Sequence, residues 1–526
     1  MKTLVLNTLD KEVSEQIKAQ INDKEVEIVD TSNMKIAHCM GCNQCWLKTP
    51  GICVIKDDYE EIIKKLVKTE NLWIVSDTRF GFLDYKGKRV MDRIVPMLNM
   101  TVGFRDGWMR HEMRYHPLNI GLLYTGDADQ TMMEDWCKRT AANIGGHSLG
   151  AIALGNNAKQ VVNEKETKPV ITGRPKHLVI INGSPRVAKF SNTDKIIHSF
   201  VKGLEETGIT WELYNLSNRK EWDAAREVFL TNERILIAFP LYVECMPSLM
   251  LEFLESLPSE RRQPAQLSFL LHGGMDEGYE FRFCERILQE LPAQLGCSFG
   301  GTLIHGGSFG IRTREDSIKA KIVTPYEKMG RLFAQNGSFL TPEARKFTGP
   351  EQYPWLVRKM VSLLFLKKVN KGFEDFAKSW GCTRPLNDKP YSEGPRFTFN
   401  TVGLFTNDNM ATVDFYTKTF GFTTSWDGVQ PNVEMFLGDY RIILYPRSAF
   451  EQMVSKEFEY PQGLNGTMEL SFDVPTFADV DKEYQNALNN GAKSVLPPTT
   501  EPWGQRTCYV ADPDGNLIEI GSFVEG

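Results

Sequence analysis

Short apolar runs alternate with helical patterns along the first three-fifths of the chain. Runs of strand length lie at 2–6, 26–29, 72–76, 120–124 and 150–154, and again at 178–181, 234–240 and 267–271. Continuous apolar runs of this length are typical of buried parallel strands, and strands that alternate with helices predict doubly wound sheets. A polar stretch at 163–176 separates the two sets. We therefore expect two α/β domains with parallel sheets, at 1–162 and 176–315.

The rest of the chain follows two other patterns. Apolar residues at helical spacing predict helices at 317–335 and 354–380, within a helical extension and linker at 316–395. In the second of these helices we expect a buried core stripe made of Met360, Leu363, Leu364 and Phe365.

The segment 396–526 repeats one order of elements twice. Its predicted elements lie at 398–405, 410–420, 433–437 and 441–445, and then at 467–474, 477–490, 506–510 and 516–522. In each set a strand is followed by a helix and then by further strands. This internal repeat predicts an α+β domain of paired βαβββ modules.

Composition narrows the function classes. The net charge is −6 and we find no sizeable basic stripe, so we expect neither nucleic acid nor a membrane as a partner. The first apolar run is too short for a signal peptide, which favours a cytoplasmic protein. In that compartment the ten cysteines are expected to be thiols or metal ligands. Six of them show no paired spacing and are expected to be buried: Cys137, Cys245, Cys284, Cys297, Cys382 and Cys508.

The run 177–193 combines a strand, a polar loop and the start of a helix. Loop N–H groups and the positive end of a helix dipole favour an anion at such a point. Neither G-x-G-x-x-G nor G-K-[ST] occurs here, so a phosphate monoester fits better than a pyrophosphate or a triphosphate. An ordinary turn between strand and helix is the alternative. The expected anion ligands are Ser184, Arg186, Ser191, Asn192 and Thr193.

This run carries a resemblance to a known family. N-G-S-P-R followed by S-N-T resembles the flavin-phosphate loop of the NAD(P)H-dependent FMN reductases, whose fold is flavodoxin-like. The resemblance extends to two later loops that would contact the flavin, formed by Pro240, Leu241 and Tyr242 and by Gly273 and Gly274. It implies FMN bound by 176–315, with NAD(P)H as co-substrate. Residues 1–162 look like a second, diverged flavodoxin-like copy, whose first loop at 7–10 is degenerate for FMN.

The first copy instead contains a compact cysteine motif. Cys39, Cys42, Cys45 and Cys53 have the spacing C-x2-C-x2-C-x7-C. Thiolate-rich sites select iron–sulfur clusters or zinc. The pattern resembles the motif of the iron–sulfur flavoprotein branch of the same family, which implies a [4Fe-4S] cluster beside FMN. Zinc, and free or disulfide-exchanging thiols, are the alternatives.

Family members usually work as dimers with the flavin near the interface. The resemblance therefore implies an internal pseudo-dimer of the two flavodoxin-like halves, in which one half holds FMN and the other presents the cysteines. Whether the chain also forms a homodimer stays open.

The C-terminal segment resembles the vicinal oxygen chelate superfamily, which includes glyoxalases and bleomycin-resistance proteins. The resemblance is carried by T-V-D-F-Y at 412–416, by Gly421-Phe422 and by A-D-P-D-G-N at 511–516. Metal-dependent relatives use His, Glu and Gln ligands. The aligned positions here are Thr401, Leu444, Glu469 and Glu519, and no histidine follows His305. We expect a cup that binds a small molecule without a metal, with Trp426, Phe436 and Trp503 as candidate wall residues. The alternatives are a weak site for a hard cation on the two carboxylates, and core packing of the three aromatic residues.

Together these features predict a flavin-dependent oxidoreductase. It would pass electrons from NAD(P)H through FMN to a small acceptor, such as a quinone, a nitroaromatic or a flavin, or through the cysteine centre. One alternative is a binding or resistance protein that acts through the C-terminal cup. Another is an electron carrier for a partner protein. The sequence singles out no catalytic acid or base.

Overall fold

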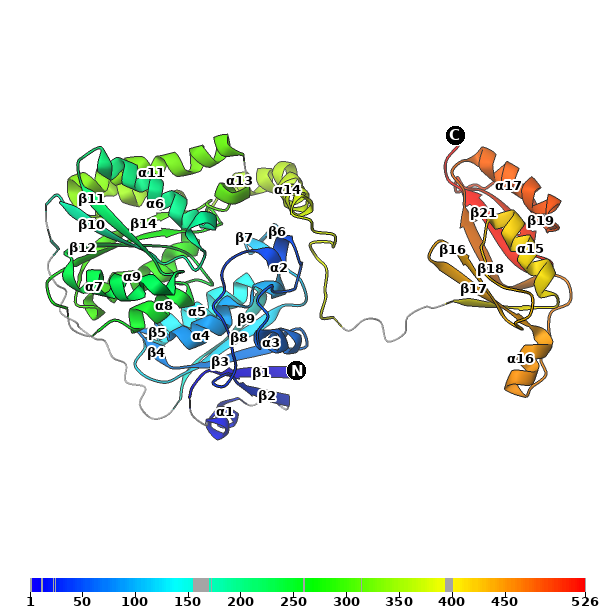
Figure 1. Ribbon diagram of the computed structural model, residues 1–526, viewed down its shortest axis with the longest axis horizontal. Coiled ribbons are helices and arrows are strands. Elements are labelled where there is room, and N and C mark those ends of the chain that lie inside the picture. Colours follow the sequence, from blue (N-terminus) through cyan, green and yellow to red (C-terminus); the bar gives the residue numbers. More distant parts are fainter. Residues whose placement is uncertain are drawn as a thin grey trace. The chain divides into compact units, whose positions relative to one another are not determined.

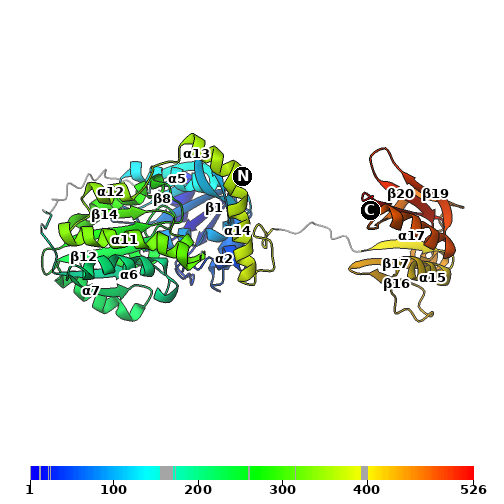
Figure 2. The same ribbon diagram turned by 90° about the horizontal axis from the view of Figure 1, so that it is seen from above.

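The computed structural model describes residues 2–10, 13–21, 23, 25–154, 170–171, 173–258, 261–313, 315–392 and 401–525 (Figures 1 and 2). They belong to two compact units, Met1–Ser392 and Glu393–Gly526. Most of the polar stretch at 163–176 and the start of the strand expected at 398–405 lie outside the described residues. Among the described helices, none combines the length and the apolar character needed to cross a membrane.

The first unit begins with a parallel five-stranded sheet. Its strand order is β2-β1-β3-β8-β9, and each neighbouring pair is parallel. The strands are β1 (Lys2–Asn7), β2 (Glu25–Asp30), β3 (Asn71–Ser76), β8 (Leu118–Tyr124) and β9 (Gly145–Ala153). The helices are α1 (Ser14–Gln20), α2 (Gln44–Leu47), α3 (Tyr59–Leu66), α4 (Tyr85–Asp92) and α5 (Gln130–Asn143). Two hairpins interrupt this plan, β4 (Thr78–Arg79) with β5 (Phe82–Leu83) and β6 (Leu98–Arg105) with β7 (Trp108–Met113).

A second parallel sheet follows with the same topology. Its order is β11-β10-β12-β13-β14. The strands are β10 (His177–Asn182), β11 (Thr210–Asn215), β12 (Arg234–Pro240), β13 (Gln266–His272) and β14 (Ser298–His305). The helices are α6 (Asn192–Glu205), α7 (Trp222–Thr231), α8 (Ser248–Glu255), α9 (Arg282–Gln294) and α10 (Gly310–Thr313). In this doubly wound order, ligands bind beyond the carboxyl ends of the strands.

The two sheets share one hydrophobic core. Buried residues of β3 and β8 belong to the same cluster as those of β12 and β13, with α4, α5, α8 and α9 between the sheets. Phe82 contacts Phe283 across this layer at a centroid distance of 5.4 Å. A second cluster joins the other face of the second sheet to α6 and α11 (Asp316–Asn336). The two predicted α/β halves are therefore packed into one unit.

The helical extension contains α11, α12 (Pro342–Phe347), α13 (Trp355–Met360), a π-helical turn at Val361–Phe365 and α14 (Leu366–Ser379). The core stripe predicted here is wrong. Met360, Leu363, Leu364 and Phe365 are 47%, 78%, 67% and 47% exposed. Helical periodicity identifies an apolar face, but it does not show what covers that face.

The second unit contains two small mixed sheets, with orders β15-β17-β16 and β18-β21-β20-β19. The strands are β15 (Val402–Thr406), β16 (Val433–Leu437), β17 (Tyr440–Pro446), β18 (Asn465–Asp473), β19 (Lys493–Thr500), β20 (Arg506–Ala511) and β21 (Asn516–Ser522). The helices are α15 (Asn409–Phe420), α16 (Arg447–Val454) and α17 (Phe477–Asn489). The second module is βαβββ as predicted, whereas the described part of the first is βαββ.

Candidate functional site

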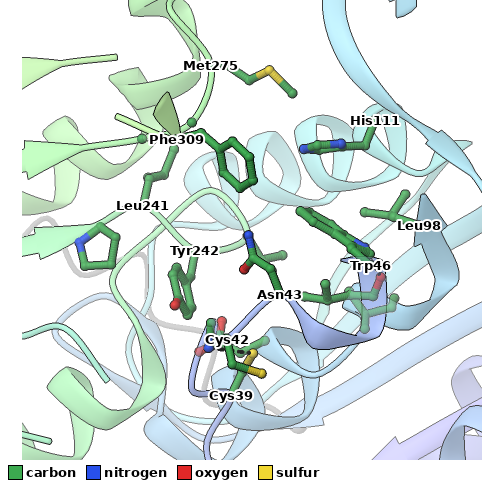
Figure 3. Close-up of a pocket in the computed structure, with 18 of the residues that line it drawn as sticks. Cys39, Cys42, Asn43, Trp46, Leu98, His111, Leu241, Tyr242, Met275 and Phe309 are labelled. Atoms are coloured by element: carbon green, nitrogen blue, oxygen red, sulfur yellow. Dashed lines mark hydrogen bonds between the residues drawn. The ribbon is translucent and has the colours of Figure 1, made fainter. Parts of the chain in front are cut away.

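A cavity with a volume of about 330 Å³ lies between the two halves of the first unit. From the second half it is lined by the loops after β10, β12, β13 and β14. From the first half it is lined by the cysteine segment, by β7 and by the end of α5. In Figure 3, Cys39, Cys42 and Trp46 of the first half lie opposite Leu241, Tyr242 and Phe309 of the second. The volume is in the range of small-molecule sites.

Nearly all of the predicted site residues line this cavity. They are Cys39, Cys42, Cys45, Cys53, Ser184, Arg186, Asn192, Thr193, Pro240, Leu241, Tyr242, Gly273 and Gly274. Ser191 has a different position. Its hydroxyl caps α6 by accepting a hydrogen bond from the Asp194 N–H at 3.2 Å. The side chain predicted as an anion ligand therefore fixes the start of the helix.

The loop after β10 is held together by hydrogen bonds of its own residues. The Asn182 side-chain oxygen accepts from the Ser184 N–H at 3.1 Å, and the Ser184 hydroxyl accepts from the Arg186 N–H at 3.3 Å. The side-chain oxygen of Asn192 is buried without a hydrogen-bond partner among the described residues. Because α6 begins at Asn192, its positive dipole end faces this loop.

A second arginine, Arg312 on α10, was not predicted. Its Nη2 donates to the Cys42 carbonyl at 2.7 Å, and its guanidinium lies 4.3 Å from the Trp380 ring centroid. Its Nη1 is buried and has no partner in the described part of the chain. Burial and the nearby Arg186 lower the pKa of Arg312 to about 10. Burial and the cations Lys319, Arg186 and Arg312 also lower the pKa of Lys195. Positive charge is therefore concentrated beside the loop.

His272, at the end of β13, connects three of the loops. Its Nε2 lies 2.8 Å from the Thr193 hydroxyl and its Nδ1 lies 2.8 Å from the Ser308 hydroxyl. Burial and Arg186 lower its pKa to about 3, so the ring is neutral. Because the Ser308 hydroxyl donates to the Gly273 carbonyl at 2.8 Å, it accepts from Nδ1–H. His272 Nε2 then accepts a hydrogen bond from the Thr193 hydroxyl. The hydroxyl proton of Thr193 is therefore not available to donate to a ligand.

The turn after β12 is strained and is held by the other half. Val243 and Glu244 have positive φ angles of 41° and 65°, a conformation that costs energy for residues other than glycine. Lys88 donates to the Tyr242 carbonyl at 2.7 Å, and Arg139 pairs with Glu244 at 2.6 Å. Asn143 also donates to the Glu244 carboxylate. Three side chains from α4 and α5 therefore fix the turn.

Tyr242 lies directly against the cysteine motif. A Cβ atom at position 41 would be 1.6 Å from the Tyr242 hydroxyl oxygen, and Gly41 has φ of +58°. Both facts require glycine at this position. Burial also raises the pKa of Tyr242, so its hydroxyl keeps its proton.

The four predicted cysteines all line the cavity, but the described residues contain no group of three or more His, Cys, Asp or Glu side chains placed to hold a metal ion. The thiol donors are the type that an iron–sulfur cluster requires. Their arrangement among the described residues does not close around one centre. Burial raises the pKa of Cys39 to about 12, and it also raises that of Cys45. The six other cysteines are buried, as predicted.

A second group of polar side chains lines the cavity, contributed by β7, α5 and the segment before α9. Arg110, Thr140 and Glu280 are 6%, 1% and 8% exposed. Arg110 Nε, Thr140 Oγ1 and Glu280 Oε1 have no hydrogen-bond partner within the described ranges, and the same holds for His111 Nδ1. Burial, with Glu244 nearby, raises the pKa of Glu280. Burial lowers the pKa of His111 to about 4, so it is neutral. We call Arg110, His111, Thr140 and Glu280 the polar wall.

Of the four positions aligned with metal ligands in the second unit, three are engaged in hydrogen bonds or core packing and one is exposed. The Thr401 hydroxyl donates to the Arg441 carbonyl at 2.9 Å, and Leu444 is fully buried. Glu519 accepts from the Ser471 and Thr507 hydroxyls at 2.7 and 2.9 Å, and Glu469 is exposed. Of the candidate wall aromatics, Trp426 packs partly against the core, whereas Phe436 and Trp503 are 40% and 65% exposed.

Comparison with known proteins identifies this unit. Residues 398–520 match the Glyoxalase/Bleomycin resistance protein/Dioxygenase superfamily. An uncharacterized protein of Bacillus subtilis is 31% identical over 122 residues, which are 23% of this chain and 93% of that protein. The C-terminal domain belongs to this superfamily. A further relative of this chain, an uncharacterized protein of Mycobacterium bovis, is 30% identical over 123 residues, with 22% of this chain and 78% of that protein covered.

Several solved structures resemble about a quarter of the chain. One is a glyoxalase/bleomycin resistance protein/dioxygenase family enzyme from Burkholderia phytofirmans, 26% identical, with 24% of this chain and 97% of that chain covered and a TM-score of 0.22. A glyoxalase-related enzyme from Fulvimarina pelagi is 21% identical, with 24% and 86% covered and a TM-score of 0.22.

One relative outside the glyoxalase superfamily resembles a shorter stretch. An iron–sulfur flavoprotein of Methanocaldococcus jannaschii is 33% identical over 81 residues. The match covers 15% of this chain and 39% of that protein. It is a similarity to part of a flavoprotein and extends over less than half of its length.

Proposed function

We propose that the first unit is a flavin-dependent oxidoreductase that passes electrons from NAD(P)H through FMN to a small acceptor, such as a quinone, a nitroaromatic or a flavin. One observation carries the proposal. The loops after β10, β12, β13 and β14, which are neighbouring strands in the doubly wound sheet, meet at one cavity. Beside it lie Arg186 and Arg312, which have no carboxylate partner among the described residues. The short similarity to an iron–sulfur flavoprotein agrees with it. In this proposal both halves are flavodoxin-like and form an internal pseudo-dimer.

The residues present fit FMN. The Ser184 hydroxyl, the first N–H groups of α6, Arg186 and Arg312 Nη1 would hold the phosphate as a dianion. The free side-chain oxygen of Asn192 can accept from a ribityl hydroxyl. Leu241 and Tyr242 would lie against the ring, and the strained turn would be kept in place by Lys88, Arg139 and Asn143. When bound, FMN supplies the two-electron redox chemistry.

The polar wall is suited to the acceptor. Arg110 and Thr140 offer donors to an acceptor oxygen, and neutral His111 adds one further hydrogen-bonding nitrogen. Glu280 holds a proton at neutral pH because its pKa is raised. A protonated carboxyl can donate to a quinone or nitro oxygen that gains negative charge during reduction. Glu280 is therefore the proton donor in this proposal.

Replacing Arg312 by alanine should weaken FMN binding about 10- to 100-fold, because hydrogen bonds to charged groups contribute about 1.5–3 kcal/mol. The measurement is a titration of apoprotein followed by flavin fluorescence. Arg312→Lys keeps the charge and should recover part of the affinity. Arg262→Ala is the matched control, since Arg262 is exposed and pairs with Glu227. Unchanged affinity in Arg312→Ala would remove this residue from the phosphate site.

The first experiment is an absorption spectrum of anaerobically purified full chain, with flavin and iron counted. One FMN per chain supports the proposal. Two FMN would contradict the division of roles between the halves, and a colourless protein that also rejects added FMN would refute it. Iron at about four per chain would show that the cysteines close around a cluster when it is present, whereas FMN without iron would leave them as thiols or as ligands of another metal.

The C-terminal domain supports a second candidate function, which is small-molecule binding or resistance. The observation that favours it is the superfamily match over 398–520. Tight binding of a small molecule to the full chain, unaffected by Arg312→Ala and without NAD(P)H oxidation, would favour this function. Reduction of a partner protein without turnover of small acceptors would instead indicate an electron carrier.

A further inference from the structure

An apolar surface is exposed on the helical extension of the first unit. We call it the outer face, and it consists of Trp355, Leu356, Met360, Leu363, Leu364 and Phe365. Trp355 and Leu356 are 57% and 72% exposed, and Leu363 is the most exposed of the six at 78%. Single exposed apolar residues are ordinary, but a contiguous group of this size marks an interaction surface.

The opposite side of the same segment is firmly attached to the unit. Asn370 accepts from the Val102 N–H at 2.9 Å and donates to the Val102 carbonyl at 3.0 Å. Arg358 donates to the Gly107 carbonyl at 2.8 Å. Ala377 packs with Leu47 and Met100 in a small core. The hairpin β6–β7 thus fixes the rotation of the segment about its axis, and the outer face points away from the rest of the first unit.

Positive charge accompanies this apolar surface. The residues from 355 to 371 include five cations and no acidic residue, although the whole chain has a net charge of −6. Four of the cations are exposed, namely Lys359, Lys367, Lys368 and Lys371. No salt bridge joins these four lysines to a described carboxylate. Figures 1 and 2 show α13 and α14 at the surface of the first unit.

We propose that the outer face binds reversibly to an anionic lipid surface. Trp, Leu and Phe flanked by lysines are typical of helices that lie in the headgroup region, where the apolar side chains enter the acyl boundary. Lysines near the surface are attracted by anionic headgroups. A second copy of this chain is a poorer occupant, because a two-fold axis would bring the same lysines close to one another. The expectation of no membrane partner rested on the net charge and on the lack of a sizeable basic stripe, and it gave no weight to this local group of five cations. The proposal is independent of the flavin chemistry.

The test is co-sedimentation of the full chain with vesicles of phosphatidylcholine, alone or mixed 3:1 with phosphatidylglycerol. We expect binding to the anionic vesicles, weak binding to the neutral ones, and loss of binding as KCl is raised to 0.5 M. Lys367→Gln with Lys368→Gln should weaken binding about 25-fold, at about fivefold for each lysine. Leu363→Gln with Leu364→Gln should abolish it while leaving the thermal unfolding midpoint unchanged, because both side chains are exposed.

Arg345→Gln with Lys346→Gln is the matched control, since it removes two exposed cations from α12. Equal loss of binding in this control and in the lysine pair would show that only general charge matters and would overturn the proposal. Absence of binding to anionic vesicles would also overturn it. Light scattering that finds a dimer converted to monomer by Leu363→Gln with Leu364→Gln would assign the outer face to a second copy instead.

Discussion

Substituting Lys88 by methionine should lower the free energy of unfolding of the first unit by about 3–5 kcal/mol, the cost of leaving a buried charge without its partner. Lys88 and Asp92 are fully buried and form an ion pair on α4. Asp92 also accepts from the Ser248 N–H at 2.7 Å on α8. The pair therefore joins the two halves as well as filling the core. Urea unfolding of the full chain, followed by tryptophan fluorescence, measures the effect.

Two companion variants isolate the cause. Lys88→Met with Asp92→Leu removes both charges and should regain much of the lost stability, as buried pairs replaced by apolar residues do. Lys64→Met removes an exposed lysine that pairs with Glu61 three residues away, and it should cost less than about 1 kcal/mol. Equal effects of Lys64→Met and Lys88→Met would contradict the assigned role of burial.

Glu280→Gln should lower kcat/KM for a quinone such as menadione by about 10²–10⁴, the usual contribution of a proton donor. Glutamine keeps the shape and a hydrogen-bond donor but cannot release a proton. In the native protein the raised pKa keeps Glu280 protonated at low and neutral pH. Activity should therefore fall as the pH rises through this pKa. In Glu280→Gln this fall in activity at high pH should be absent.

FMN affinity and the pH profile of Glu280→Gln distinguish the loss of a proton donor from a misfolded cavity. FMN affinity should stay within about twofold of the native value, which a misfolded cavity would not allow. Glu290→Gln is the matched control, because Glu290 is exposed on α9. A Glu280→Gln variant with a native pH profile would show that the proton comes from water or from another group, even if the flavin chemistry itself is correct.

Most of the α/β elements could be predicted because the apolar run or helix cap that identifies each one lies within its own short segment. The run at 178–181 and the caps around Ser191 define β10 and α6 without reference to the rest of the chain. Strands with weaker local signals were not predicted. β11 is only half buried, and β14 contains two consecutive glycines, so neither gives the apolar run of a buried parallel strand. The hairpin β6–β7 is an insertion in the alternating plan.

The site residues could be predicted only where they lie in a loop that directly follows a strand. Ser184, Arg186 and Tyr242 follow strands directly, and the carboxyl ends of parallel strands meet at one edge. Arg110, Glu280 and Arg312 come from a hairpin, a short turn and a four-residue helix that are far apart in sequence. No spacing rule brings them together, and their chemistry depends on burial, which appears only once both halves are packed.

The strained turn at 242–245 has one more consequence. Its supports, Lys88, Arg139 and Asn143, belong to the other half of the same chain. Two separately encoded subunits that shared a site in this way would lose it on dilution, as they dissociate. Here the covalent connection fixes the effective concentration of one half around the other, typically in the millimolar range for short linkers. The geometry of the turn should therefore be independent of how much protein the cell makes.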